Sequence, residues 1–206
     1  MKIYLQTIQL LQKLFLAVSI TIMLALPLVM VFRPNSLSGN TINDLYNLSH
    51  VTVLFVMVIR PLADIFTKTR WIRPLVILRK GAGVLSASIV ISFIFAKIIV
   101  DPVGYISSFG AIKYWSFQNL AIFAHLADIS AILLLITSNN FSKRILGSWW
   151  KRIQRLSYVY FYASSLYIFI ILNNNMAFVS IALVTLLTII AYSKNRALAA
   201  NEAQTI

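Results

Sequence analysis

Long apolar runs alternate with short polar segments along nearly the whole chain. Because a helix needs about 20 mainly apolar residues to cross a bilayer, this pattern predicts an all-α integral membrane protein built as a six-helix transmembrane bundle. The residues after the last run are polar and predict a short frayed tail. The expected helices cover residues 14–32, 45–65, 83–100, 120–137, 156–172 and 177–192, in a single transmembrane domain of residues 1–192 with a tail of residues 193–206.

Two junctions between these runs bear on the helix count. The first run resembles a secretory signal peptide, but no small-residue cleavage site follows it, so we interpret it as the first membrane helix. The fifth and sixth runs are separated only by Asn173, Asn174 and Asn175. This asparagine tract predicts a tight polar turn between two helices.

Composition agrees with a membrane location and excludes several kinds of chemistry. Of the 206 residues, 60% are hydrophobic and 11% are charged, and the mean hydropathy is +0.84, well above the values of soluble domains. The chain contains no cysteine, which excludes disulfides, iron–sulfur clusters and cysteine nucleophiles. It also has no glycine-rich dinucleotide loop and no P-loop, so electrons for any redox function have to come from another protein.

The formal net charge of +13 is distributed unevenly. Of the 18 Lys and Arg residues, all but Arg33, Lys97 and Lys113 lie in the N-terminal segment, in the second and fourth connections or in the tail. Cytoplasmic loops retain basic residues, so both the N-terminus and the C-terminus are predicted to be cytoplasmic. No basic cluster lies on a polar, soluble domain, and nucleic acid is therefore not an expected partner.

Three short motifs occur in order along the chain. They are Pro61-Leu62-Ala63 at the end of the second run, Arg79-Lys80-Gly81-Ala82-Gly83 before the third, and TSNNFSKRILGSWWKRIQ from Thr137 into the fifth. Together they resemble the bacterial ferric-reductase-like transmembrane domain family, nearest to its haem-binding membrane subunits of periplasmic methionine sulfoxide reductase systems. The resemblance covers residues 45–172. The matching positions are Arg79, Lys80 and Gly83 at the third helix, and Leu146, Gly147, Trp149, Trp150 and Ile153 at the fifth.

The resemblance also implies where haem ligands should lie, and here the sequence departs from the family. The histidine of the third helix falls at Phe93, and the two histidines of the fifth helix fall at Gln154 and Tyr167. Phe93 has no donor atom, Gln154 is a poor iron ligand, and a tyrosinate favours ferric iron over a bis-imidazole redox couple. We therefore expect no cofactor at the family's haem positions.

The two histidines of the chain offer a different haem site. His50 and His125 each lie about five residues into a predicted helix that starts at the outer face, which places both about 8 Å below that interface. Imidazoles at one depth on two helices could be the axial ligands of haem b. The alternative is a pair of interfacial histidines that form hydrogen bonds with their neighbours or with lipid head groups and hold no cofactor.

Asp128 lies near the middle of the fourth predicted helix. A carboxylate within the membrane is costly when charged and alone, so Asp128 is expected to face the interior of the bundle. One interpretation is a proton or quinone site, and the other is a structural hydrogen bond with Ser130, His125 or a backbone carbonyl. Lys97, near the outer end of the third helix, is expected to extend its ammonium to the interface and to pair with Asp101.

The resemblance and the missing ligands lead to one functional expectation and one alternative. We expect a haem-less accessory or structural subunit of a larger membrane redox or energy-converting complex in the bacterial inner membrane, without catalytic activity alone. Its partners would be membrane lipids and the other subunits. The alternative is an electron-transfer protein, with haem b on His50 and His125 or a bound flavin or quinone, that delivers electrons to an outer-face partner.

Overall fold

The computed structural model describes residues 2–33, 37–116 and 121–204, and this part of the chain is helical without any strand. Short helices join the longer ones at both ends of the molecule. The elements in chain order are α1 (Lys2–Phe32), α2 (Gly39–Ile65), α3 (Ile72–Leu75), α4 (Leu78–Val100), α5 (Pro102–Gly110), the 3₁₀ helix η2 (Ile112–Trp115), α6 (Ala121–Thr137), α7 (Asn140–Leu146), α8 (Ser148–Gln154), α9 (Leu156–Leu172) and α10 (Asn175–Gln204).

Each apolar run lies within a helix, but several helices are longer than the runs. The ends of α2 at Ile65 and of α6 at Thr137, and both ends of α9, are those expected. Helices α1, α2 and α4 begin earlier than the runs, and the early start of α2 is capped by the side chain of Ser38, which accepts a hydrogen bond from the N–H of Thr41. The expected start of the fourth helix at residue 120 lies outside the described residues.

The last helix extends further than the sequence predicted, beyond the expected end at Tyr192. Helix α10 continues from the apolar run through the polar residues to Gln204. The segment Ala197-Leu198-Ala199-Ala200 and the residues after it are good helix formers, so the helix propagates without an apolar environment. Polarity marked the end of the apolar run and not the end of the helix.

Four helical segments of the described residues are long and apolar enough to cross a membrane, namely Ile3–Phe32, Gly39–Ile65, Ile72–Val100 and Asn175–Ala200. A fifth is added if α6 and α7, bent by 95° relative to each other, count as one span. Helices α6 and α9 have 17 residues each, or about 26 Å at 1.5 Å per residue, slightly less than the roughly 30 Å hydrocarbon core. The described part of the chain is therefore all-helical, and the length and composition of its helices are compatible with a multi-pass membrane protein.

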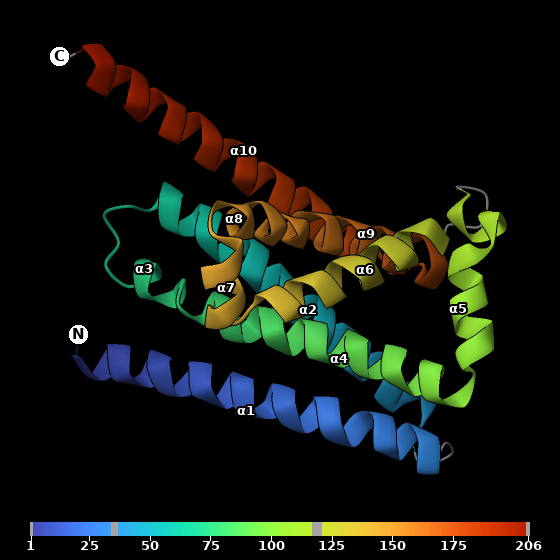
Figure 1. Ribbon diagram of the computed structural model, residues 1–206. Coiled ribbons are helices and arrows are strands. Elements are labelled where there is room, and N and C mark those ends of the chain that lie inside the picture. The colour runs from blue at the N-terminus through green and yellow to red at the C-terminus, as the bar shows by residue number, and fades with distance from the viewer. Residues whose placement is uncertain (1, 34–36, 117–120, 205–206) are drawn as a thin grey trace.

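The long helices run side by side, and the connecting elements gather at the two ends of the bundle (Figure 1). Both termini lie at the same end, together with α3, α7 and α8. Helix α5 crosses the opposite end. The segments rich in Lys and Arg are therefore at the end that carries the termini.

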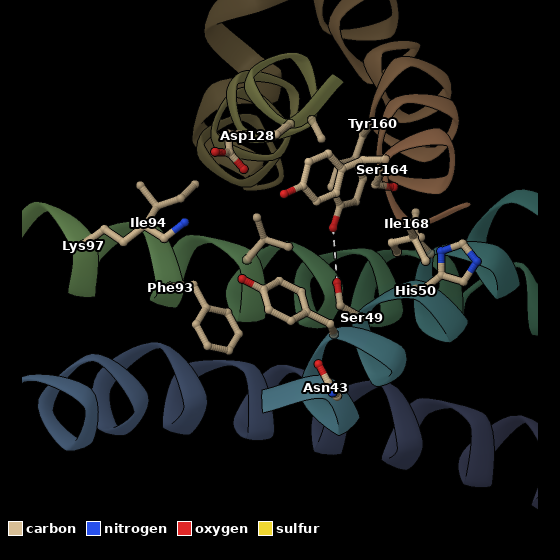
Figure 2. A pocket seen from close by; sticks show the side chains of 16 residues that line it. Asn43, Ser49, His50, Phe93, Ile94, Lys97, Asp128, Tyr160, Ser164 and Ile168 are labelled. Carbon is tan, nitrogen blue, oxygen red and sulfur yellow. Dashed lines mark hydrogen bonds between the residues drawn. The ribbon is translucent and has the colours of Figure 1, made fainter. Parts of the chain in front are cut away.

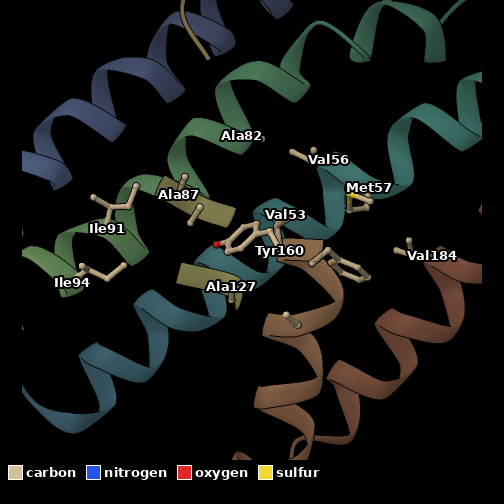
Figure 3. Close-up of a cluster of buried hydrophobic side chains, with 13 residues drawn as sticks. Val53, Val56, Met57, Ala82, Ala87, Ile91, Ile94, Ala127, Tyr160 and Val184 are labelled. Carbon is tan, nitrogen blue, oxygen red and sulfur yellow. The ribbon is translucent and has the colours of Figure 1, made fainter. Parts of the chain in front are cut away.

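The core lies between α2, α4, α6 and α9. Val53 and Met57 of α2, Ala131 of α6 and Phe161 of α9 are among its most buried side chains. Figure 3 shows Tyr160 at its centre, with small residues such as Ala87 and Ala127 on the neighbouring helices. Small side chains let helix backbones approach closely inside a bilayer.

Helix α1 packs against α4 at one glycine. A Cβ atom on Gly81 would lie 3.0 Å from Cβ of Phe15 and 3.3 Å from the carbonyl oxygen of Gln12. At Gly83 the nearest atom, Cγ2 of Val56, would be 3.8 Å away. A side chain at Gly81 would thus make tight contacts with α1, whereas one at Gly83 would make only ordinary van der Waals contact.

The asparagine tract forms the tight turn that the sequence predicts. Asn173 caps α9 in the left-handed conformation, with φ 48° and ψ 36°, which asparagine tolerates better than most residues. The side chain of Asn174 accepts a hydrogen bond from the backbone N–H of Met176 at 3.0 Å. Two antiparallel helices are thereby joined without a longer loop.

Candidate functional site

A cavity of about 250 Å³ lies between α2, α4, α6 and α9, in the half of the bundle nearer to α5. We call it the Asp128 cavity (Figure 2). Its wall mixes apolar side chains with hydroxyls, an imidazole, a carboxyl and an ammonium. The residues that line it are Asn43, Tyr46, Ser49, His50, Val53, Val90, Phe93, Ile94, Lys97, Ala124, Ala127, Asp128, Tyr160, Ser164, Tyr167 and Ile168.

Asp128 reaches this cavity from α6, as expected for a carboxyl group that faces the bundle interior. Its Oδ2 accepts a hydrogen bond from the hydroxyl of Tyr105 on α5, at 3.5 Å. Tyr105 was not among the structural partners expected from the sequence, which were Ser130, His125 and a backbone carbonyl. Lys97 lines the same cavity from α4, so a cation and a carboxyl group share one polar space.

Tyr105 is positioned by a short helix that its own capping residues define. The side chain of Asp101 accepts a hydrogen bond from the N–H of Gly104 at 2.9 Å, and Pro102 occupies the first turn of α5. This Asp-Pro start is a recognisable signal for a helix N-terminus. Asp101 was expected to pair with Lys97, but this pair is not among the ion pairs of the described residues. Asp101 instead caps the N-terminus of α5.

The inner end of the cavity is closed by a hydroxyl network. Tyr160 of α9 lies 2.9 Å from Oγ of Ser86 on α4 and 3.3 Å from Oγ of Ser49 on α2. The two serines lie 2.9 Å apart, and each also donates to the backbone carbonyl of the other. The polar side chains are thus paired within the core, and they hold three helices in register.

The positions that the resemblance assigns to haem ligands are occupied by side chains with other roles. Phe93 is buried and stacks on Tyr46, with ring centroids 4.6 Å apart and an interplanar angle of 12°. Tyr167 lines the same cavity from α9. Gln154 lies nearer the other end of the bundle, where its Nε2 donates to Oγ1 of Thr137 at 3.2 Å. These three residues supply no imidazole, and they do not fit haem as the family's ligands would.

His50 and His125 have different surroundings. Nε2 of His50 lies 3.4 Å from Oγ of Ser180 on α10, and its ring stacks on Phe161 at 6.1 Å. His50 lines the Asp128 cavity, at the opposite side from Asp128 in Figure 2.

His125 is buried on α6 beside aromatic rings of α5 and η2. Its ring lies 4.4 Å from that of Phe109 and 5.4 Å from that of Trp115. The two imidazoles thus have no aromatic neighbour in common among these contacts. Haem on His50 and His125 stays a prediction from the sequence.

Within the described residues, no group of three or more His, Cys, Asp or Glu side chains could hold a metal ion. The Asp128 cavity is instead suited to a small polar or aromatic molecule, because hydroxyl groups and a carboxyl group converge on a mainly apolar wall. Sequence reasoning found Asp128 and His50. It named Phe93 and Tyr167 only as lost haem positions and missed Tyr46 and Tyr160, because nothing in a chain with nine tyrosines marks those that face the interior.

A second cavity, of about 540 Å³, lies at the end of the bundle that carries the termini. We call it the basic cavity, because Arg60, Arg79, Lys80, Lys143 and Lys151 are among its lining residues. Gln154 and Trp150 also line it, and Tyr160 and Val53 line both cavities. Tyr160 therefore stands between the two spaces.

Comparison of the chain with protein-family models, with curated proteins and with solved structures found no match. The resemblance to the ferric-reductase-like family stays a prediction from the short motifs.

Proposed function

We propose that this protein is a haem-free accessory subunit of a larger membrane redox or energy-converting complex, built on a ferric-reductase-like bundle. The observation that carries the proposal is the Phe93–Tyr46 stack. At the position where the resemblance implies a haem ligand, an aromatic ring without a donor atom is buried against a second ring. Both rings line the Asp128 cavity, so its wall carries no imidazole at the position where the resemblance implies one.

The proposed topology has six membrane-spanning helices and both termini in the cytoplasm of a bacterium, with the protein in the inner membrane. Two observations support it. The termini, α3, α7 and α8 lie at one end of the bundle, and that end holds most of the basic residues. Cytoplasmic loops retain such residues, whereas α5 at the opposite end contains neither Lys nor Arg.

The lack of cysteine makes this topology directly testable. Ser107→Cys on α5, Thr67→Cys after α2 and Ala200→Cys on α10 each introduce one thiol at an exposed position. In intact spheroplasts, a membrane-impermeant maleimide should label only Ser107→Cys, and permeabilisation should expose the other two. Labelling of Ala200→Cys before permeabilisation would overturn the orientation.

The functional proposal is tested by gentle purification followed by spectroscopy. We expect the protein to migrate with other subunits in mild detergent and to show no Soret band in an oxidised-minus-reduced spectrum. A stoichiometric haem signal that is lost in both His50→Ala and His125→Ala would overturn the proposal and establish the relocated haem. Recovery of a redox-active monomer would contradict the accessory role.

The second candidate function is electron transfer through a small quinone or flavin in the Asp128 cavity. It is favoured by the convergence of Asp128, Lys97 and the tyrosine hydroxyls on one space. A soluble short-chain quinone should then quench tryptophan fluorescence in a saturable way in the wild type and more weakly in Asp128→Asn. Asp64→Asn is the matched control, since Asp64 pairs with Arg60 outside this cavity. Equal quenching in both variants would exclude this role for Asp128.

A further inference from the structure

The basic cavity combines two chemically different regions. Its mouth is formed by basic side chains from α2, α4, α7 and α8, and its depth is formed by aliphatic side chains of α2, α4 and α6. The mouth carries Arg60, Arg79, Lys80, Lys143 and Lys151, and the depth carries Val53, Val56, Val84, Ala87, Leu134 and Leu135. This polarity matches an amphiphile with an anionic head and an apolar chain.

The charge of the mouth is only slightly balanced by acidic groups. Arg60 is paired with Asp64 through Nε and Oδ2 at 3.2 Å. No acidic residue is among the side chains that line the cavity within the described part of the chain. Like charges brought together around one cavity repel each other, and an anion in their midst relieves that repulsion.

The guanidinium of Arg79 has a hydrogen-bond donor that lacks an acceptor in the described part of the chain. Its Nε is buried and has no hydrogen-bond partner among the described residues. A buried donor without an acceptor is costly, and a guanidinium is best satisfied by the paired oxygens of a phosphate or carboxylate. Arg79 is thus placed to bind an oxyanion that enters the cavity.

The size and depth of the cavity distinguish between anions. At about 540 Å³, it falls within the roughly 300–1,000 Å³ range of small-molecule sites, far more than one phosphate requires. Its deep wall is aliphatic, and the hydroxyl of Tyr160 is already paired with Ser49 and Ser86. This depth has nothing to recognise a sugar or a base, but it accommodates a hydrocarbon chain.

We propose that the basic cavity binds an anionic phospholipid or a related long-chain phosphate, with the phosphate at Arg79 and Lys80 and the chain along the aliphatic wall. The mouth lies at the end of the bundle that the proposed topology places at the cytoplasmic leaflet, where anionic lipids supply such head groups. The basic cavity is distinct from the Asp128 cavity, so this lipid-binding proposal does not depend on whether the protein carries haem or a quinone.

The test uses the full-length protein, delipidated in a neutral detergent and titrated with three probes. These are dioleoylphosphatidylglycerol, dioleoylphosphatidylcholine and inorganic phosphate, and the readouts are bound lipid by native mass spectrometry and the thermal unfolding midpoint. We expect saturable binding and an upward shift of the midpoint with phosphatidylglycerol only. Equal effects of phosphatidylcholine would overturn the role of charge, and equal effects of inorganic phosphate would overturn the role of the chain.

Variants then locate the binding. Arg79→Gln with Lys80→Gln removes the two cations of α4, and Lys143→Gln with Lys151→Gln removes exposed cations of α7 and α8 that carry little folding risk. Each pair should weaken phosphatidylglycerol binding by roughly fivefold for each cation removed. The matched control is Lys68→Gln with Arg70→Gln, which removes two exposed cations outside the cavity. An equal loss of affinity in the control would mean diffuse surface attraction and would overturn the site.

Discussion

The hydroxyl of Tyr105 on α5 donates a hydrogen bond to Oδ2 of Asp128 on α6 across 3.5 Å. This contact ties a short helix at the end of the bundle to the carboxyl group of the Asp128 cavity. Since it joins α5 to a long helix, the contact is a natural place to test whether the end of the bundle is coupled to its interior.

The first prediction is an energetic coupling between these two side chains. The hydrogen bond is long, so Tyr105→Phe should lower the free energy of unfolding by at most about 1 kcal/mol. In the Asp128→Ala background the same change should have little further effect. SDS-induced unfolding of the four proteins of this double-mutant cycle provides the measurement. A Tyr105→Phe effect of the same size in both backgrounds would show that the hydroxyl acts elsewhere.

The second prediction concerns alkaline pH. Burial, together with the nearby Asp128 carboxyl, raises the pKa of Tyr105 above its usual value. The unfolded chain releases a tyrosine proton at about pH 10, whereas the folded protein holds it to higher pH. The stability that Tyr105 contributes is therefore complete below about pH 10 and is lost as the pH rises further.

The measurement is the difference in unfolding midpoint between the wild type and Tyr105→Phe from about pH 8 to pH 11. The advantage of the wild type should shrink at the upper end of this range. Tyr192→Phe is the matched control for loss of a hydroxyl at an exposed position. A difference that stays constant over the whole range would contradict the prediction.

The third prediction concerns Tyr160, which separates the two cavities. In Tyr160→Phe, Ser49 and Ser86 still pair with each other and with backbone carbonyls, so the cost should be about 1 kcal/mol. Tyr160→Ala removes a buried ring at the centre of the core and should cost about 3–5 kcal/mol. Thermal unfolding in detergent distinguishes the two. Similar losses in both variants would indicate that the hydroxyl dominates and the ring does not.

The fourth prediction compares two glycines on α4. Gly81→Ala places a methyl group 3.0 Å from Cβ of Phe15, so α1 must move away and the protein should be destabilised. Gly83→Ala meets its nearest atom at 3.8 Å and should be neutral or stabilising by up to about 1 kcal/mol, because alanine favours the helix. Unfolding midpoints and the protease sensitivity of α1 report the outcome. Destabilisation of both variants to the same degree would contradict the close packing at Gly81.

The sequence by itself determined the long apolar helices and the uneven distribution of charge, but it did not mark the short helices α3, α5, α7 and α8. The long helices depend on short segments, since an apolar run of sufficient length is a helix in a bilayer wherever the other helices lie. The asparagine turn was predictable for the same local reason. The end of the last helix was not predictable in this way, because its extension to Gln204 depends on backbone propensity, which the apolar pattern does not report.

The tertiary structure alone decided which side chains face one another. Tyr46 lies on α2 and Phe93 on α4, and no local sequence pattern shows that their rings stack. The same holds for Tyr105 with Asp128 and for the residues that form the basic cavity. Contacts between helices depend on the rotation and depth of each helix, which packing of small and large side chains fixes across the whole bundle.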